Sequence, residues 1–329
     1  MRAHLTLPRA LAVIAALSVV AVLALAVALA SGSVPVSARD VLDALAGRAG
    51  SEGAAVVRDL RVPRALAAFA VGALLSLAGA LMQVLLRNPL ADPYVLGLSG
   101  GAAVGALGTT VAGVAALAGP AAFAGALLST LIVFSLARAD AERFAWAPTR
   151  LLLTGVVVAA GWGAVVALLL AIAPAAQTKG LVHWLLGDLA GAAAPGTPLA
   201  VLAFALAVAL AMARDLNALA RGPGEASVLG VDVPKTSLAL HALAALATAA
   251  AVTTAGSIGF VGLVVPHAMR LVLGNDQRLL LPAAAIAGGA LLVVADTAAR
   301  TIVAPVELPV GVLTALLGVP AFLFLLRQR

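Results

Sequence analysis

Long apolar runs separated by short polar connections dominate this chain, and this pattern predicts transmembrane helices. A helix that crosses a bilayer needs about 20 predominantly apolar residues. Ten such runs can be traced, over residues 10–30, 65–86, 95–117, 121–136, 151–173, 199–213, 238–255, 258–273, 279–296 and 309–326. We therefore expect an all-α integral membrane protein of about ten transmembrane helices, forming a single domain over residues 1–329.

The first run has a competing interpretation. It follows Arg2 and Arg9 and ends in Ala28-Leu29-Ala30, which resembles a signal-peptide cleavage site. The apolar region of a signal peptide is usually only about 7–15 residues long. The run over 10–30 is longer, which favours a retained first helix.

Composition narrows the class of protein. The chain is 63% apolar and 10% charged, against about 45–50% and about a quarter in soluble domains. A soluble globule is therefore excluded. The absence of cysteine excludes disulfides, thiolate metal sites and a cysteine nucleophile. The four histidines are scattered without a His-x-x-x-His pair, so we expect no metal site and no cofactor.

The charged residues predict the topology. An even number of spans puts both termini on one side, and that side then receives thirteen of the 20 basic residues. The positive-inside rule makes it the cytoplasmic side. Because the basic residues lie at the ends of apolar runs, the net charge of +6 indicates a bilayer partner and not nucleic acid.

Five basic residues oppose this rule by crowding into the first outer loop: Arg39, Arg48, Arg58, Arg61 and Arg64. A partner with acidic groups on the outer side would explain them. Neutralisation by acids of the same loop, namely Asp40, Asp43, Glu52 and Asp59, would also explain them. Both explanations can hold together.

The sequence contains no nucleotide-hydrolysing motif. A Walker A loop needs glycines before its lysine, and neither Lys179 nor Lys235 has them. We therefore expect no enzymatic activity, and if the chain takes part in active transport, the energy has to come from another polypeptide. An ion-coupled secondary transporter is an alternative, but it needs ionisable residues deep in its spans, which are almost absent here.

An intramembrane serine protease is a second alternative. Gly97-Leu98-Ser99-Gly100 resembles the nucleophile motif of rhomboid proteases, and His241 is the only base at membrane depth. The helix around His241 lacks the glycines that would bring it against the serine. Gly97, Gly101 and Gly105 recur every four residues, a spacing typical of close helix packing.

Several motifs contain more polar, proline and glycine residues than helix packing requires. They are Arg61-Val62-Pro63-Arg64, Gln83 followed by Arg87-Asn88-Pro89-Leu90-Ala91-Asp92-Pro93, Gly224-Glu225-Ala226 with Leu229-Gly230-Val231, Gly259-Phe260-Val261-Gly262 continuing to Pro266-His267 and Arg270, and Glu307-Leu308-Pro309-Val310-Gly311. Together they resemble the FecCD-type permeases of ATP-binding-cassette (ABC) importers for ferric siderophores, haem or vitamin B12. The resemblance covers residues 61–326.

This resemblance implies the permease of a type II ABC importer, a multi-pass protein of the bacterial inner membrane. It implies a homodimer with the pathway at its interface, two cytoplasmic ABC ATPase subunits and a periplasmic binding protein. Arginines that match Arg61, Arg64 and Arg300 face the periplasm in this family and pair with glutamates of the binding protein. We expect the same docking role here.

The polar stretch over residues 214–235 is the expected cytoplasmic coupling loop. Its short amphipathic piece between glycines predicts a surface helix that docks on a soluble partner. The resemblance assigns this segment to ATPase coupling, through Arg221, Gly222, Gly224, Glu225, Ala226, Leu229, Gly230 and Val231.

The transport pathway is expected to run along the fifth span and the segment over residues 181–190. Trp184, Gly187 and Asp188 are the candidate lining residues of this segment. Apolar walls suit a flat, apolar ligand, which places haem ahead of a ferric siderophore or cobalamin as the metal chelate carried.

Overall fold

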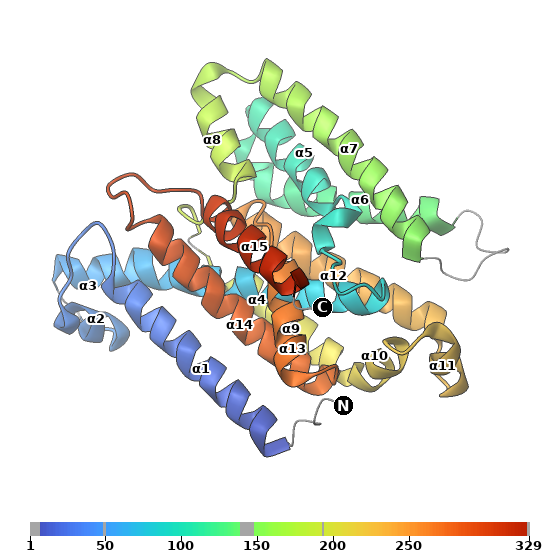
Figure 1. The fold of residues 1–329 in the computed structure, drawn as a ribbon. Coiled ribbons are helices and arrows are strands. Elements are labelled where there is room, and N and C mark those ends of the chain that lie inside the picture. Colours follow the sequence, from blue (N-terminus) through green and yellow to red (C-terminus); the bar gives the residue numbers. More distant parts are fainter. Residues whose placement is uncertain (1–6, 49–50, 139–147, 193, 328–329) are drawn as a thin grey trace.

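The computed structural model describes residues 7–48, 51–138, 148–192 and 194–327, whose regular structure is helical throughout. Figure 1 shows the long helices side by side in a bundle. They are α1 (Leu7–Ala30), α4 (Val62–Leu85), α6 (Ala118–Arg138), α7 (Pro148–Ile172), α12 (Val233–Ala255), α14 (Gln277–Ala299) and α15 (Val310–Arg327).

Shorter helices complete the described chain. They are α2 (Ala38–Leu45), α3 (Glu52–Val56), α5 (Leu98–Val111), α8 (Ala175–Leu185), α9 (Gly196–Ala211), α10 (Ala213–Leu219), α11 (Pro223–Val228) and α13 (Val261–Leu273), with a π-helical turn η1 (Val57–Arg61) and 3-10 turns η2 (Pro93–Leu96) and η3 (Ala115–Leu117).

The helices account for every predicted apolar run. Within the described residues, six helices are long and apolar enough to cross a membrane, and α9 with α10 forms one further span bent by 64°. Helices α5, α13 and α15 are shorter apolar helices. The prediction of an all-α membrane protein with about ten spans is confirmed. The short helix α8 was not predicted, and α5 and α13 are shorter than their apolar runs.

Helix α4 is the centre of the bundle. Every residue from Ala70 to Leu85 is buried, and the helix packs against α14, α12, α13 and α9. Two glycines permit these contacts, because a Cβ atom on Gly72 would overlap the carbonyl oxygen of Gly288, and one on Gly79 would overlap that of Gly262. Small residues let membrane helices approach closely, so these two glycines serve helix packing.

The glycine repeat at the start of α5 also serves packing. A Cβ atom on Gly101 would overlap the backbone of Gly125, and one on Gly105 would overlap that of Ala121, both in α6. The Ser129 hydroxyl donates a hydrogen bond of 2.9 Å to the carbonyl oxygen of Gly97. Helices α5 and α6 therefore run antiparallel in close backbone contact.

The link between α12 and α13 lies inside the bundle. A Cβ atom on Gly262, at the start of α13, would lie 2.9 Å from the carbonyl oxygen of Leu75 in the middle of α4. The backbone N–H of Ile258 in this link donates to the Tyr94 hydroxyl at 3.1 Å. Irregular backbone at this depth is tolerated because protein surrounds it.

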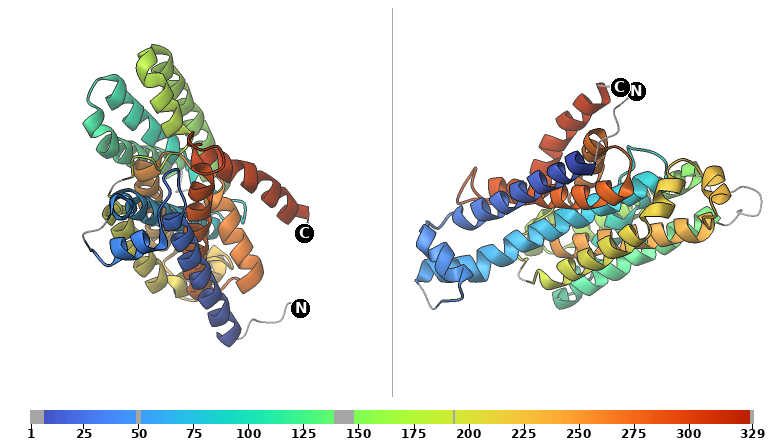
Figure 2. Two further views of the ribbon diagram at one scale, coloured as in Figure 1. Left: turned by 90° about the vertical axis from the view of Figure 1, so that its left-hand side faces the viewer. Right: turned by 90° about the horizontal axis from the view of Figure 1, so that it is seen from below.

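The bundle has two distinct ends. Figure 2 places the start of α1, the end of α15 and the pair α10–α11 at one end, here named the inner end. Helices α2 and α3 lie at the opposite end, here named the outer end. The first and last described helix ends thus share one side, as an even number of spans predicts.

Candidate functional site

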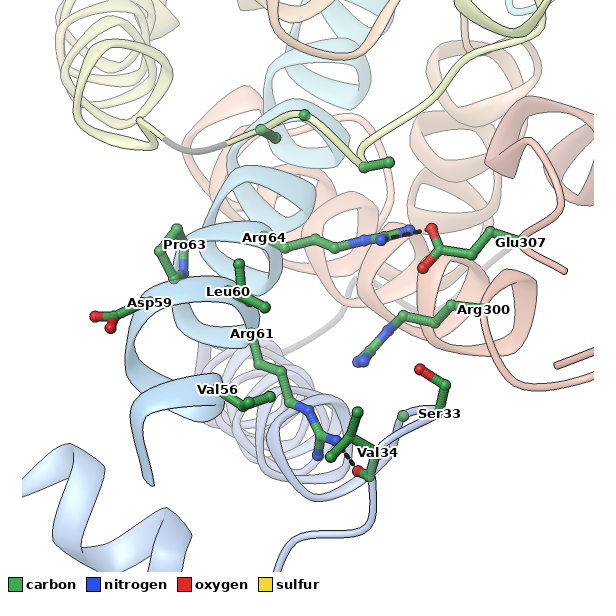
Figure 3. Close-up of a pocket in the computed structure, with 14 residues that line it drawn as sticks. Ser33, Val34, Val56, Asp59, Leu60, Arg61, Pro63, Arg64, Arg300 and Glu307 are labelled. Atoms are coloured by element: carbon green, nitrogen blue, oxygen red, sulfur yellow. Dashed lines mark hydrogen bonds and ion pairs between the residues drawn. The ribbon is translucent and has the colours of Figure 1, made fainter. Parts of the chain in front are cut away.

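The three arginines predicted to dock a partner meet in one pocket at the outer end. The pocket has a volume of about 420 Å³ and is lined by Arg61, Arg64 and Arg300 together with Glu307. Figure 3 shows Arg61 on η1, Arg64 on α4, and Arg300 and Glu307 on the α14–α15 connection. We name the five residues Arg61, Arg64, Asp296, Arg300 and Glu307 the outer cluster.

Arg64 holds two carboxylates at once. It lies in the first turn of α4, where Pro63 begins the regular helix. Its Nε and Nη2 atoms donate to the two oxygens of Asp296 at 3.0 and 2.9 Å, and its Nη1 atom donates to Glu307 Oε2 at 2.8 Å. A bidentate arginine–carboxylate pair of this kind is strong and fixed in orientation.

Arg61 and Arg300 bind the end of α1. Arg61 donates to the carbonyl oxygens of Leu29 and Val34. Arg300 donates to those of Ala28 and Ser31. The last carbonyl groups of a helix have no partner within the helix, and cations stabilise them. The two arginines are only 5% and 8% exposed, so they attach α1 to the bundle in this chain.

The remaining arginines of the first outer loop are paired with acids of the same loop. Arg39 and Arg48 lie 3.7 and 3.4 Å from Asp43, and Arg58 lies 2.8 Å from Asp59. Neutralisation within the loop, one of the two explanations considered above, is confirmed for these three. It does not extend to Arg61, whose hydrogen bonds go to carbonyl groups.

The outer cluster carries an excess of positive charge. It contains three guanidinium groups and two carboxylates, and the Arg300 Nε atom lies 3.7 Å from Asp296 without a hydrogen-bond partner. Sequence analysis missed the pairing of Arg64 with Asp296 and Glu307, because these residues are more than 200 positions apart. Only the four-residue spacing of Asp296 and Arg300 along α14 was a local signal.

The predicted coupling loop forms α10, α11 and the turns beside them. Gly222 and Gly230 bound α11 with φ angles of 140° and 82°, which glycine adopts readily. Ala226 is completely buried against the bundle, whereas Val228 and Leu229 are 88% and 57% exposed. Glu225 lies in the first turn of α11, so the segment presents an acid and two apolar side chains at the inner end.

The candidate pathway residues Trp184, Gly187 and Asp188 lie where α8 ends beside the α12–α13 link. Gly187 has a φ angle of 83°, and a Cβ atom there would lie 2.7 Å from the Ile258 side chain. The Asp188 N–H donates to the carbonyl oxygen of Ala255 at 2.9 Å. Gly187 thus serves close packing, while pathway lining by Trp184 and Asp188 stays a prediction.

His241, the base considered for a protease, is buried and stacks on Phe134 with ring centroids 5.4 Å apart. No hydrogen bond joins it to Ser99 among the described residues. Within the same part of the chain, no group of three or more acidic or histidine side chains is arranged to hold a metal ion.

A family model described as the FecCD transport family matches residues 19–328. The chain belongs to the FecCD transport family. The match includes the outer cluster, the predicted coupling segment and the α12–α13 link.

Individual relatives cover most of this FecCD permease. The cobalamin import system permease protein BtuC of Halobacterium salinarum is 45% identical, covering 83% of this chain and 74% of the relative. The hemin transport system permease protein HmuU of Yersinia pestis is 45% identical, with coverage of 82% and 83%. The Fe(3+) dicitrate transport system permease protein FecD of Escherichia coli is 39% identical, with coverage of 90% and 92%.

Solved structures share the fold. A chain from an inward-facing conformation of a metal-chelate type ABC transporter superimposes with a TM-score of 0.85 at 26% identity, covering 96% of this chain and 99% of that one. PsaBC from Streptococcus pneumoniae in complex with Fab has a TM-score of 0.57 at 16% identity, covering 88% and 95%, and is similar in fold alone.

The FecCD permease is therefore a multi-pass membrane subunit of an ABC importer. Its family is a transport family and not a family of enzymes. Family membership overturns the intramembrane serine protease and the ion-coupled secondary transporter as interpretations of this chain.

Proposed function

We propose that this permease works as a homodimer that imports a bulky metal chelate across the bacterial inner membrane. Two cytoplasmic ABC ATPase subunits supply the energy, and a periplasmic binding protein delivers the cargo. The supporting observation is the family match over residues 19–328, together with relatives named for cobalamin, hemin and ferric dicitrate transport.

In this proposal the inner end faces the cytoplasm and the outer end faces the periplasm. The excess of basic residues on the side of the termini supports this orientation. It places α11 toward the ATPase and the outer cluster toward the binding protein.

The outer cluster is the proposed dock for acidic groups of the binding protein. Arg61, Arg64 and Arg300 line one pocket with a net positive charge, and a dimer presents two such pockets. Complementary charge steers association and fixes orientation. Arg61 and Arg300 also hold α1, so we propose that they contribute positive charge to the pocket without contacting the partner. We assign direct contact with a carboxylate of the partner to Arg64.

The segment over residues 214–235 is the proposed seat of the ATPase. Buried Ala226 fixes α11 to the bundle, while exposed Val228 and Leu229 are available to a partner. A movement of the ATPase against α11 then reaches α10 directly, and α9 through α10.

We propose haem as the first choice of cargo, ahead of a ferric siderophore and cobalamin. The proposed wall helix α7 exposes apolar side chains such as Leu153, Val157 and Leu168, and Trp184 adds an aromatic face beside it. Such a surface suits a flat, apolar chelate. Relatives that are 45% identical are named for hemin and for cobalamin alike, so the order rests on the apolar wall and both chelates enter the test.

Uptake by reconstituted vesicles tests the proposal. The permease is combined with its ATPase and binding protein, and vesicles receive haem, a ferric siderophore or cobalamin with and without ATP. We expect ATP-dependent accumulation of haem above the other two. Preferential uptake of cobalamin or the siderophore would overturn the cargo, and uptake driven by an ion gradient without the ATPase would overturn the importer itself.

A further inference from the structure

We propose that Glu307 is an exchangeable counter-ion, which occupies on Arg64 the position that a docking carboxylate takes, while Asp296 stays bound throughout. This inference rests on the proposed docking role of the outer cluster. It assigns Glu307 a role in setting how tightly an acidic partner binds.

The two carboxylates on Arg64 differ in geometry. Asp296 accepts from two nitrogens of the guanidinium group, whereas Glu307 accepts from Nη1 alone. The two side chains also differ in exposure, which is 4% for Asp296 and 45% for Glu307. A partner approaching from the outer side therefore meets Glu307 and not Asp296.

The consequences of losing each carboxylate are unequal. Removing Asp296 leaves buried guanidinium groups without their shared counter-ion, which is strongly unfavourable. Removing Glu307 from Arg64 leaves the bidentate Asp296 pair intact, and exposed ion pairs contribute little on their own. Exchange at Nη1 is thus the step that the cluster tolerates.

The backbone around Glu307 allows the side chain to leave while the chain stays in place. The N–H of the next residue, Leu308, donates to the carbonyl oxygen of Ala299 at 3.0 Å, which fixes the segment to the end of α14. Only rotation of the Glu307 side chain is needed to free Arg64. Figure 3 shows Glu307 reaching Arg64 from the side opposite α4.

The turn before Glu307 presents an apolar surface beside the exchange point. Ile302, Val303 and Val306 are 65%, 48% and 59% exposed. A charged contact surrounded by apolar side chains is typical of a docking surface, in which covered apolar contacts exclude water from the charge. An acidic protein partner fits both features.

Displacement makes Glu307 a competitor within the chain. The apparent affinity of an incoming carboxylate is reduced by the fraction of molecules in which Glu307 already occupies Arg64. When Glu307 is neutralised, the cluster keeps three guanidinium groups and a single carboxylate. We therefore expect Glu307→Gln to bind acidic partners more tightly.

Binding of a labelled hexaglutamate peptide to the permease in lipid nanodiscs tests this inference, measured by fluorescence anisotropy. We expect E307Q to bind about two- to fivefold more tightly than the natural protein, the factor for removing one exposed competing ion pair. The control E52Q removes an equal charge from the exposed Glu52 at the start of α3, and among the described residues no hydrogen bond or ion pair joins Glu52 to the outer cluster. We expect a smaller gain in this control. In R64Q the gain from E307Q should vanish.

The outcomes separate the inference from the proposal on which it rests. Equal or weaker binding by E307Q, or a gain no larger than that of E52Q, would overturn the exchange role. Unchanged peptide binding in R64Q would overturn docking at the outer cluster itself. Thermal unfolding of E307Q should match the natural protein, and a clear loss of stability would assign Glu307 a structural role in place of exchange.

Discussion

At the scale of single residues, Asp296 determines whether the outer cluster holds together. It binds Arg64 through both oxygens and lies 3.7 Å from Arg300 Nε. We expect Asp296→Asn to lower the free energy of unfolding by about 3–5 kcal/mol, because breaking a buried ion pair leaves an uncompensated charge. Thermal unfolding in detergent micelles measures the loss.

The matched control for this prediction is Asp59→Asn. Asp59 also pairs with an arginine, but both side chains are more than half exposed. Exposed pairs contribute about 0–1 kcal/mol, so D59N should unfold near the natural temperature. Equal behaviour of the two variants would contradict the importance assigned to Asp296.

A second prediction at this scale concerns Gly79. A Cβ atom there would overlap the backbone of Gly262, which cannot move aside as a flexible side chain would. We expect Gly79→Ala to separate α4 from α13 and to destabilise the protein by about 1–3 kcal/mol, as overpacking does. Gly180→Ala is the control, since nothing lies within 4 Å of its added Cβ atom, and its unfolding temperature should not fall.

At the scale of elements, α11 carries the prediction on coupling. Leu229 is exposed at the end of this helix, away from buried Ala226. We expect Leu229→Asp to leave ATP hydrolysis by the assembled transporter in place while substrate uptake falls, because a charge disrupts an apolar contact with the ATPase. The ratio of uptake to hydrolysis in proteoliposomes measures this uncoupling.

Leu42→Asp provides the control for α11. It makes the same chemical change on an exposed leucine of α2, at the opposite end of the bundle. The uptake-to-hydrolysis ratio should stay at the natural value in this variant. Coupling that survives L229D would place the ATPase contact elsewhere on the inner end.

Hydropathy was sufficient to predict the membrane elements but not how some of them end. The ten runs each correspond to a helix or a bent pair, because lipid requires apolar side chains over a fixed length. The runs at 95–117 and 258–273 did not show that their helices, α5 and α13, begin inside the bundle. Backbone shielded by protein needs no charged side chains, so residues 256–260 were distinguished from a helix only by their glycines and Ser257.

The candidate site was predictable only in part for a similar reason. The sequence drew attention to Arg61, Arg64 and Arg300, and the structure brings all three to one pocket. Their partners could not be predicted. Arg61 and Arg300 donate to backbone carbonyl groups, which every residue carries, and Arg64 finds its acids across more than 200 residues of chain.

At the scale of the whole molecule, the last prediction concerns nucleotide, since the sequence carries no Walker A motif. Neither of its lysines follows a glycine-rich loop, and Lys235 pairs with Asp232 at 2.8 Å at the start of α12. We expect the purified chain in nanodiscs to show no ATP hydrolysis, and hydrolysis to begin when an ABC ATPase subunit is added. Nucleotide binding by the chain alone would contradict this.

The attachment of α1 has a consequence for how the protein is made. A growing polypeptide inserts from its N-terminus, so α1 enters the bilayer long before most of its partners are translated. Arg61 follows Leu29 by 32 residues, but Arg300 follows Ser31 by 269. Until Arg300 is translated, only one of these two arginines is present to bind the end of the first helix. A nascent chain released before α14 is made has α1 in the membrane without the hydrogen bonds that Arg300 donates to its end.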